Sequence, residues 1–199
     1  MTSASEATST RDRILRAALA AFAERGVEAT SLDSVAAEVG VRKQTLLYWF
    51  PSKEQLLFGV VDHAVAEIGQ RLTESVLGAG PDLDDRLKAV VDATFRLGST
   101  HPELLAVVRE IARLGPPASA RLATAAEPLV DVASVGLARR DGGAPDAEHV
   151  RRVLLAAGAR VVGIATEAEV RADLGLAPDI AWLRSRRALL LADLRAHFT

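Results

Sequence analysis

The sequence predicts an all-α protein of about nine helices. Apolar residues recur at spacings of three and four along almost the whole chain, and the strict alternation typical of strands is nearly absent. Glycine and proline divide these apolar patterns into segments of helical length. With 199 residues, of which 49% are hydrophobic, the chain is long enough to bury a core. We therefore expect a short N-terminal helical unit followed by a larger helical body.

Each element has a recognisable beginning or end. The helices are expected at about 11–25, 32–39, 42–49, 53–77, 83–98, 101–114, 118–140, 146–171 and 179–198. Thr30 and Ser31 offer N-caps for the second helix, and Thr30-x-x-Asp33 has the form of a capping box with Asp in place of Glu. Gly98 is expected to close the fifth helix. Pro128 is expected to kink the seventh, because an interior proline removes a backbone hydrogen bond.

Composition limits the class of protein. The formal net charge is −2, so affinity for nucleic acid has to come from a local basic patch. There is no cysteine, which excludes disulfides, thiolate metal sites and a cysteine nucleophile. Residues 1–10 lack the features of a signal peptide and are expected to be a disordered arm. No apolar run approaches the roughly 20 residues that span a bilayer, so we expect a cytoplasmic protein without a membrane partner.

The most informative segment covers residues 40–53, Gly-Val-Arg-Lys-Gln-Thr-Leu-Leu-Tyr-Trp-Phe-Pro-Ser-Lys. It carries three basic residues and no acidic one, and its aromatic residues include the only tyrosine of the chain. Together with the two helices before it and the short turn at Gly40, it has the arrangement of a helix-turn-helix unit. The second helix of such a unit enters the major groove of DNA.

Side chains at the start of this third helix would face the base edges. Arg42 and Lys43 can donate to guanine O6 and N7. Gln44 can form two hydrogen bonds with adenine, and Thr45 can donate, accept or touch a thymine methyl group. Tyr48 has a polar tip suited to phosphate oxygens. The complete set of candidate DNA contacts is Thr30, Ser31, Arg42, Lys43, Gln44, Thr45, Leu47, Tyr48, Trp49 and Lys53.

Residues 11–57 resemble the DNA-binding domain of the tetracycline-repressor (TetR) family of bacterial transcription regulators. The matching pieces are Ile14-Leu-x-Ala-Ala-x-x-x-Phe22, Gly26, Thr30-Ser31, Val35-Ala36, Gly40-Val41, Thr45-Leu46, Phe50 and Ser52-Lys53-Glu54-x-Leu56. The resemblance implies a homodimer joined through the last two long helices, and a divergent ligand-binding and dimerisation domain over residues 58–199. The family commonly has serine where Arg42 stands and tyrosine where Leu47 stands. The base preference of the family is therefore not carried over.

Polar residues beside the apolar stripes of the middle helices are candidate ligand contacts. They are His63, Thr94 and Glu110. Such groups orient small molecules in mostly apolar pockets, and the scarcity of aromatic residues favours a lipophilic effector. The alternative is that they are hydrogen-bonded core or helix-edge residues. His63 and Glu67 are four residues apart, but a solvated or core-edge pair is a simpler role for them than a shared metal.

The last two helices carry long apolar stripes that predict a dimer interface. The residues expected there are Leu154, Ala157, Val161, Ile164, Leu183, Leu190, Leu191 and Leu194. Two such helices from each of two copies would form a four-helix interface. The alternative is that both helices complete the core of one chain.

Together these features predict a homodimeric, ligand-responsive transcription regulator, most simply a repressor released from a palindromic operator by a small lipophilic effector. A helical protein–protein adaptor and a carrier of hydrophobic ligands are the alternatives. Neither should bind a palindrome in a sequence-specific and salt-sensitive way. The sequence contains no phosphate-binding glycine loop, nucleophile elbow or metal-ligand cluster, so we expect neither an enzyme nor a cofactor or metal.

Overall fold

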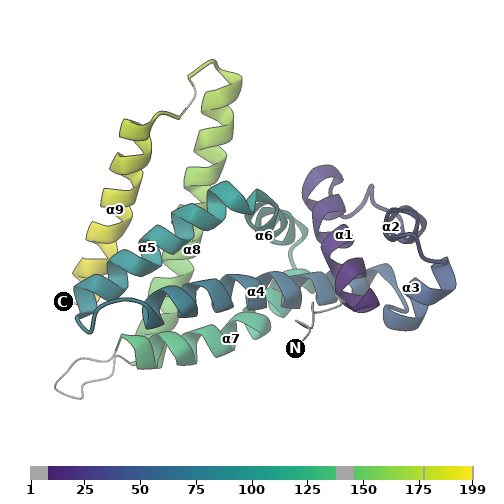
Figure 1. Ribbon diagram of the computed structural model, residues 1–199, viewed down its shortest axis with the longest axis horizontal. Helices are drawn as coiled ribbons and strands as arrows, with labels where there is room; N and C mark the ends of the chain where they lie inside the picture. The colour runs from purple at the N-terminus through teal and green to yellow at the C-terminus, as the bar shows by residue number, and fades with distance from the viewer. Residues whose placement is uncertain (1–8, 138–145, 177, 199) are drawn as a thin grey trace, which may run out of the picture. The chain divides into compact units, whose positions relative to one another are not determined.

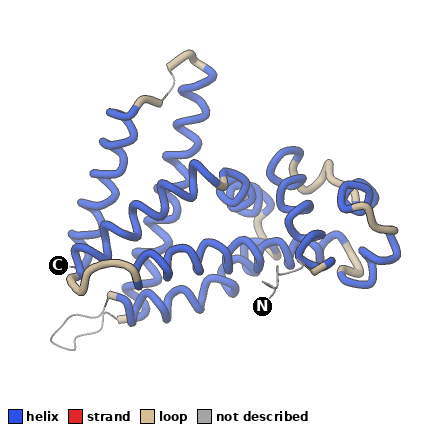
Figure 2. Tube along the Cα trace, viewed as in Figure 1, coloured by secondary structure: helices blue, strands red, loops and turns tan. Residues whose placement is uncertain are grey.

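The computed structural model describes residues 9–137, 146–176 and 178–198. Within these ranges every regular element is an α-helix (Figures 1 and 2). The helices are α1 (Thr10–Arg25), α2 (Leu32–Val39), α3 (Lys43–Trp49), α4 (Lys53–Leu77), α5 (Leu83–Thr100), α6 (Pro102–Leu114), α7 (Ala118–Gly136), α8 (Ala147–Asp173) and α9 (Ile180–Phe198). The predicted all-α class is confirmed for the part of the chain that the structure describes.

Most helix limits lie where the sequence placed them, and the differences have local causes. The α1 helix begins one residue early, because Ser9 Oγ accepts a hydrogen bond from the Asp12 amide at 3.1 Å. The α5 helix continues through Gly98, so the end predicted there was wrong; a glycine inside a helix costs only about 0.5–1 kcal/mol relative to alanine. Pro128 lies inside α7. The rest of the expected arm, residues 1–8, and the expected helix residues 138–140 lie outside the described residues.

The chain divides into two compact units. The first unit contains Met1–Ala66 and Ala106–Ala125, and the second contains Glu67–Leu105 and Ala126–Thr199. Three helices, α4, α6 and α7, therefore contribute residues to both units.

The first unit has a core built from the apolar faces of its short helices. The α1 helix packs against α2, and α2 packs against α3. Its largest side chains with at most 1% of their surface exposed are Ile14, Leu15, Phe22, Val35, Leu46, Leu56, Val60, Val61, Val107 and Ile111. Full burial of a side chain of this size contributes about 1.5–3 kcal/mol. This core fixes the helix-turn-helix on a rigid base.

The second unit has a separate core, in which α9 packs against both α5 and α8. The buried residues of this core are Leu87, Val91, Val130, Val150, Val153, Leu190, Leu194 and Phe198. Ion pairs at its edge also join α9 to α5. Arg195 Nε lies 2.6 Å from Asp84 Oδ1, and Arg187 Nε lies 2.5 Å from Asp92 Oδ1. Arg195, with help from Lys88, lowers the pKa of Asp84 to about 2.

Candidate nucleic-acid interface

The turn between α2 and α3 depends on a glycine in the left-handed conformation. Gly40 ends α2 with φ 75° and ψ 32°. An added Cβ would meet nothing within 4 Å, so backbone conformation rather than space favours glycine here. The next amide, that of Val41, donates to the Ala36 carbonyl at 2.9 Å and closes the end of α2. This turn brings α3 directly after α2, as a helix-turn-helix requires.

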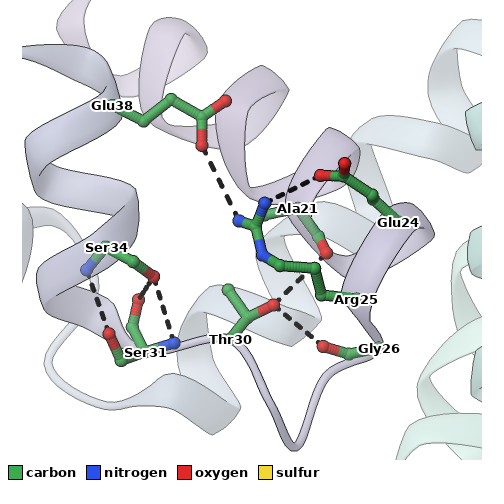
Figure 3. A network of polar contacts seen from close by, with 8 residues as sticks. All are labelled: Ala21, Glu24, Arg25, Gly26, Thr30, Ser31, Ser34 and Glu38. Atoms are coloured by element: carbon green, nitrogen blue, oxygen red, sulfur yellow. Dashed lines mark hydrogen bonds and ion pairs between the residues drawn. The ribbon is translucent and has the colours of Figure 1, made fainter.

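The loop between α1 and α2 is held by the buried hydroxyl of Thr30 (Figure 3). Thr30 Oγ1 lies 2.8 Å from the Gly26 carbonyl oxygen and 3.3 Å from that of Ala21, and it donates toward the end of α1. The side chain is only 2% exposed. The expectation that Thr30 touches DNA was therefore wrong for its side chain, because the hydroxyl serves the interior of the unit.

The N-cap of α2 lies one residue later than the predicted capping box. The Ser34 amide donates to Ser31 Oγ at 3.0 Å, and the Ser31 amide donates to Ser34 Oγ at 3.2 Å (Figure 3). Ser31 and Ser34 thus form the box, and the box predicted from Thr30 and Asp33 was wrong. Because Ser31 is exposed and precedes a helix N-terminus, it lies where a phosphate group binds favourably.

Two arginines of α1 hold the far end of α2. Arg13 Nη2 donates to the Val39 carbonyl oxygen at 2.6 Å, which provides a partner for a carbonyl at the helix C-terminus. Arg25 Nη2 lies 3.8 Å from Glu38 Oε2, and Arg25 Nη1 lies 2.7 Å from Glu24 Oε2 (Figure 3). The sequence patterns did not reveal these contacts, because they depend on how α2 folds back against α1.

The α3 helix separates a buried anchor from an exposed polar face. Leu46 is fully buried, and Leu47 is half-buried. The predicted contact residues that are exposed are Arg42, Lys43, Gln44, Thr45, Tyr48 and Trp49. Tyr48 is 79% exposed and Trp49 is 42% exposed, with their rings edge to face and 5.3 Å between centroids. Exposed aromatic side chains of this kind are enriched where proteins bind partners.

The two lysines near this face already have protein partners. Lys43 Nζ lies 2.8 Å from Asp33 Oδ2, which places a carboxylate beside the start of α3. Lys53 Nζ donates to the Glu28 carbonyl oxygen at 2.8 Å, from the first residue of α4. That helix is capped by Ser52, whose Oγ accepts from the Gln55 amide at 3.1 Å. Both lysines remain on the surface and can exchange these partners for phosphate or base oxygens.

The three candidate ligand contacts do not gather in one compact unit. His63, half-buried on α4, and Glu110 belong to the first unit, whereas Thr94 belongs to the second. Thr94 Oγ1 donates to the Val90 carbonyl oxygen at 2.8 Å within its own helix. The Glu110 carboxylate accepts from the Val27 amide at 2.9 Å and pairs with Arg113. Thr94 and Glu110 thus both make hydrogen bonds within the protein.

The predicted dimer residues of α8 and α9 mostly face the core of their own unit. Leu190 and Leu194 are buried there, so assigning them to a dimer interface was wrong; the strongest apolar stripe packs on α5 instead. Leu154, Ala157, Val161 and Leu191 are half-buried and pack against the same core. Ile164 is half-buried and Leu183 is 41% exposed.

Other apolar residues of these helices and of the connection between them are exposed. They are Leu155, Val170, Leu174, Leu176, Ile180 and Leu189. A groove of about 510 Å³ runs between α8 and α9 and is lined in part by Arg160, Gly163, Ile164, Leu189 and Asp193. Leu155 is 75% exposed and Leu189 is 57% exposed, each directly beside a residue of the predicted stripe. In the sequence, the exposed apolar residues of α8 and α9 form only a second, weaker stripe beside the predicted one.

Across residues 9–137, 146–176 and 178–198, no group of three or more His, Cys, Asp or Glu side chains could hold a metal ion. None of the helices in these ranges combines the length and apolar character needed to cross a bilayer.

Residues 14–60 match the sequence model of "Bacterial regulatory proteins, tetR family". These residues are identified as similar to the tetR family. The matched residues contain α2, α3 and the whole turn at Gly40, so the family assignment and the geometry concern the same part of the molecule.

Curated relatives that match part of the chain are transcription regulators. The chain is 27% identical over 105 residues to the HTH-type transcriptional repressor NicS of Pseudomonas putida, which covers 53% of the chain and 49% of NicS. It is 48% identical over 48 residues to the HTH-type transcriptional regulator RutR of Escherichia coli, which covers 24% of the chain and 23% of RutR. The chain thus spans about half the length of NicS and less of RutR.

A solved structure resembles the chain over most of its length. The fatty acid degradation regulator FadR from Bacillus halodurans matches with a TM-score of 0.72 and 18% identity, over 94% of this chain and 96% of that one. At this identity the likeness concerns the fold alone.

Proposed function

We propose that the protein is a homodimeric repressor of transcription that binds a palindromic operator through α3. The proposal depends on the two faces of α3. Leu46 on its inner face is buried, and a row of hydrogen-bonding side chains on its outer face is exposed. A helix held in this way can enter a major groove without rearranging its own unit. The name of the relative NicS, a transcriptional repressor, supports the sign of regulation.

Within this proposal the side chains of α3 have two kinds of role. Lys43, Gln44 and Thr45 are exposed in its first turn, where a recognition helix contacts base edges. Arg42 immediately precedes the helix and Leu47 lies on its half-buried side, so both reach the groove margin. The remaining contacts, Ser31, Tyr48, Trp49 and Lys53, are assigned to the phosphate backbone, where donors set position rather than sequence preference.

The dimer contact is proposed on the outward side of α8 and α9. Small exposed residues recur there at helical spacing: Ala156, Ala159, Gly163 and Thr166 on α8, and Ala181, Ser185, Ala188, Ala192 and Ala196 on α9. A Cβ added at Gly163 would meet nothing within 4 Å, so packing within one chain does not require a glycine there. Small side chains allow two helices to approach closely, and Leu155 and Leu189 would supply buried apolar area.

Release of the operator by a small lipophilic effector stays part of the proposal, but its site changes. Thr94 and Glu110 have partners of their own, so neither is assigned to the ligand. We assign no contact residues to the effector. We place the protein in the cytoplasm and assign it no catalytic activity, in keeping with relatives that are transcription regulators.

Selection of bound sequences from a random DNA library tests the proposal directly. The full chain should recover a palindrome, and binding to it should weaken steeply with salt because phosphate contacts release counterions. Recovery of random sequence, or binding without salt dependence, would instead favour the protein–protein adaptor. Binding of a hydrophobic probe without any effect on DNA would favour the ligand carrier.

A further inference from the structure

The turn between α1 and α2 is held by one side chain of its own loop and by side chains from two other helices. Thr30, just before α2, donates to the end of α1. Lys53, at the start of α4, donates to the Glu28 carbonyl oxygen at 2.8 Å. Glu110, on α6, accepts from the Val27 amide at 2.9 Å. Adjacent residues of one turn are therefore held by two helices that lie far apart in the sequence.

The Glu110 contact is short, charged and largely shielded from water. The Glu110 side chain is 13% exposed, and the Val27 residue is 7% exposed. Oε1 accepts from both the Val27 amide and Arg113 Nη2, each at 2.9 Å, and Oε2 accepts from Arg113 Nε at 2.8 Å. Hydrogen bonds to a carboxylate are about twice as strong as those between neutral groups.

The preceding glycine makes room for this carboxylate. Gly26 has φ 80°, and a Cβ placed on it would lie 3.2 Å from Glu110 Oε1. Hydrogen bonds from Arg113 and from the Val27 amide lower the pKa of Glu110 to about 2. The carboxylate therefore stays charged and available to the turn at every pH at which the protein would meet DNA.

We propose that Glu110 is a positioning residue for operator binding: it fixes the Val27–Glu28 turn, and through that turn the N-cap of α2 and the ammonium group of Lys53. The proposal rests on the operator-binding function above. Without Glu110, the Val27 amide has lost its acceptor and the turn becomes free to move. Binding DNA must then order this turn again. The free-energy cost of that ordering reduces operator affinity, as a loss of preorganisation does generally.

Four variants of the full chain separate this role from others. Glu110→Ala removes both the contact to Val27 and the pair with Arg113. Glu110→Gln keeps an oxygen that can accept from Val27, and Arg113→Gln removes only the ion pair. Glu24→Ala is the matched control, because Glu24 is a 72% exposed glutamate at the end of α1.

The measurement is affinity for the selected palindrome, together with hydrogen exchange at the Val27 amide. Glu110→Ala should weaken operator binding about 5- to 30-fold, within the usual range for coupled elements, and should speed exchange at Val27. Glu110→Gln, Arg113→Gln and Glu24→Ala should each change affinity by less than about threefold, the scale of a surface ion pair. The selected base sequence should stay the same in all four variants.

A double-mutant cycle with Lys53→Ala identifies the route. Because both side chains act on the same turn, the loss in the double variant should be smaller than the product of the two single losses. Unchanged affinity in Glu110→Ala, or losses that multiply independently, would overturn the inference while leaving operator binding intact. Absence of any palindrome for the wild-type chain would instead overturn the proposed function, and the inference with it.

Discussion

The helix-turn-helix unit and the α8–α9 pair differ in which large apolar side chains they leave exposed to solvent. Among the described residues, the large apolar side chains left exposed in the helix-turn-helix are Tyr48 and Trp49, both on the outer face of α3. Those exposed on the C-terminal pair and its connection are Leu155, Val170, Leu174, Leu176, Ile180, Leu183 and Leu189. The first unit therefore buries its aliphatic side chains and exposes two aromatic residues with polar tips. The α8–α9 pair instead leaves aliphatic side chains exposed to solvent, as interaction surfaces do.

The difference distinguishes a region that is complete in one chain from a region that is proposed to need a second copy. The first unit holds α3 with residues of one chain, including residues of α4 and α6. The α8–α9 pair is proposed to complete its burial only in a dimer, which also sets the distance between the two α3 helices. Breaking each region should accordingly have different consequences.

The largest effect is expected from a charge on the outward side of α9. Leu189→Glu should dissociate the dimer while preserving helicity, because an unpaired carboxylate buried in an interface costs about 3–5 kcal/mol. Sedimentation velocity at micromolar concentration, with circular dichroism alongside, measures both properties. The neighbouring Leu190→Glu is the control, since Leu190 is 3% exposed and its replacement should disrupt the second unit itself. A Leu189→Glu protein that remains dimeric would show that the interface lies elsewhere.

The next effect concerns base preference. Gln44→Ala should cost about 1–3 kcal/mol on the selected operator and relax the preference at one base pair in each half-site. Gln70→Ala, an exposed glutamine in the second unit, should change neither property. Repeating the library selection with both variants tests this. An unchanged selected sequence with Gln44→Ala would mean that α3 docks in a different register.

The two regions also differ in how much of their structure could be predicted from the sequence. The helix-turn-helix was predictable because its signals are local: the apolar spacing of its helices, the short turn at Gly40 and the basic segment 40–53. The role of Glu110 was not, because its partner Val27 lies 83 residues away and meets it only in the folded unit. Nor could periodicity distinguish Leu190 from Leu189, because a helix that packs on both sides carries two apolar faces.

A smaller effect is expected from Lys53. Lys53→Ala should weaken binding to all DNA by a similar factor and reduce the salt dependence by about 0.9 per lost phosphate contact. Affinity measured at several salt concentrations, on the operator and on a scrambled duplex, gives both quantities. A loss confined to the operator would assign Lys53 to base recognition instead.

The opposite change is expected at Asp33, whose carboxylate lies 2.8 Å from Lys43 Nζ. Asp33→Asn should release the ammonium group, strengthen binding to scrambled DNA and steepen its salt dependence by about one contact per subunit. Asp131→Asn, an exposed acid on α7, serves as the control for net charge. Equal effects from the two substitutions would indicate a general charge effect rather than a partner of Lys43.

The smallest effect is on stability at low pH. The pKa of Asp84 is lowered from 3.8 to about 2, so its carboxylate favours the folded state above about pH 4 and loses that contribution as the pH falls toward 2. The difference in urea midpoint between wild type and Asp84→Asn should therefore shrink across this range. Because the pair with Arg195 is half exposed, the difference should be small at any pH. A difference in urea midpoint that does not vary with pH would show that the Asp84 carboxylate does not stabilise the folded state.

The central claim is that one dimer places two α3 helices in successive major grooves on the same side of the DNA. Affinity for the selected palindrome, with and without five extra base pairs between its half-sites, tests this claim most directly. Five base pairs are about half a helical turn and move the second half-site to the opposite side of the duplex. We expect the insertion to reduce affinity to that of a single half-site. Equal affinity for the two duplexes would contradict it.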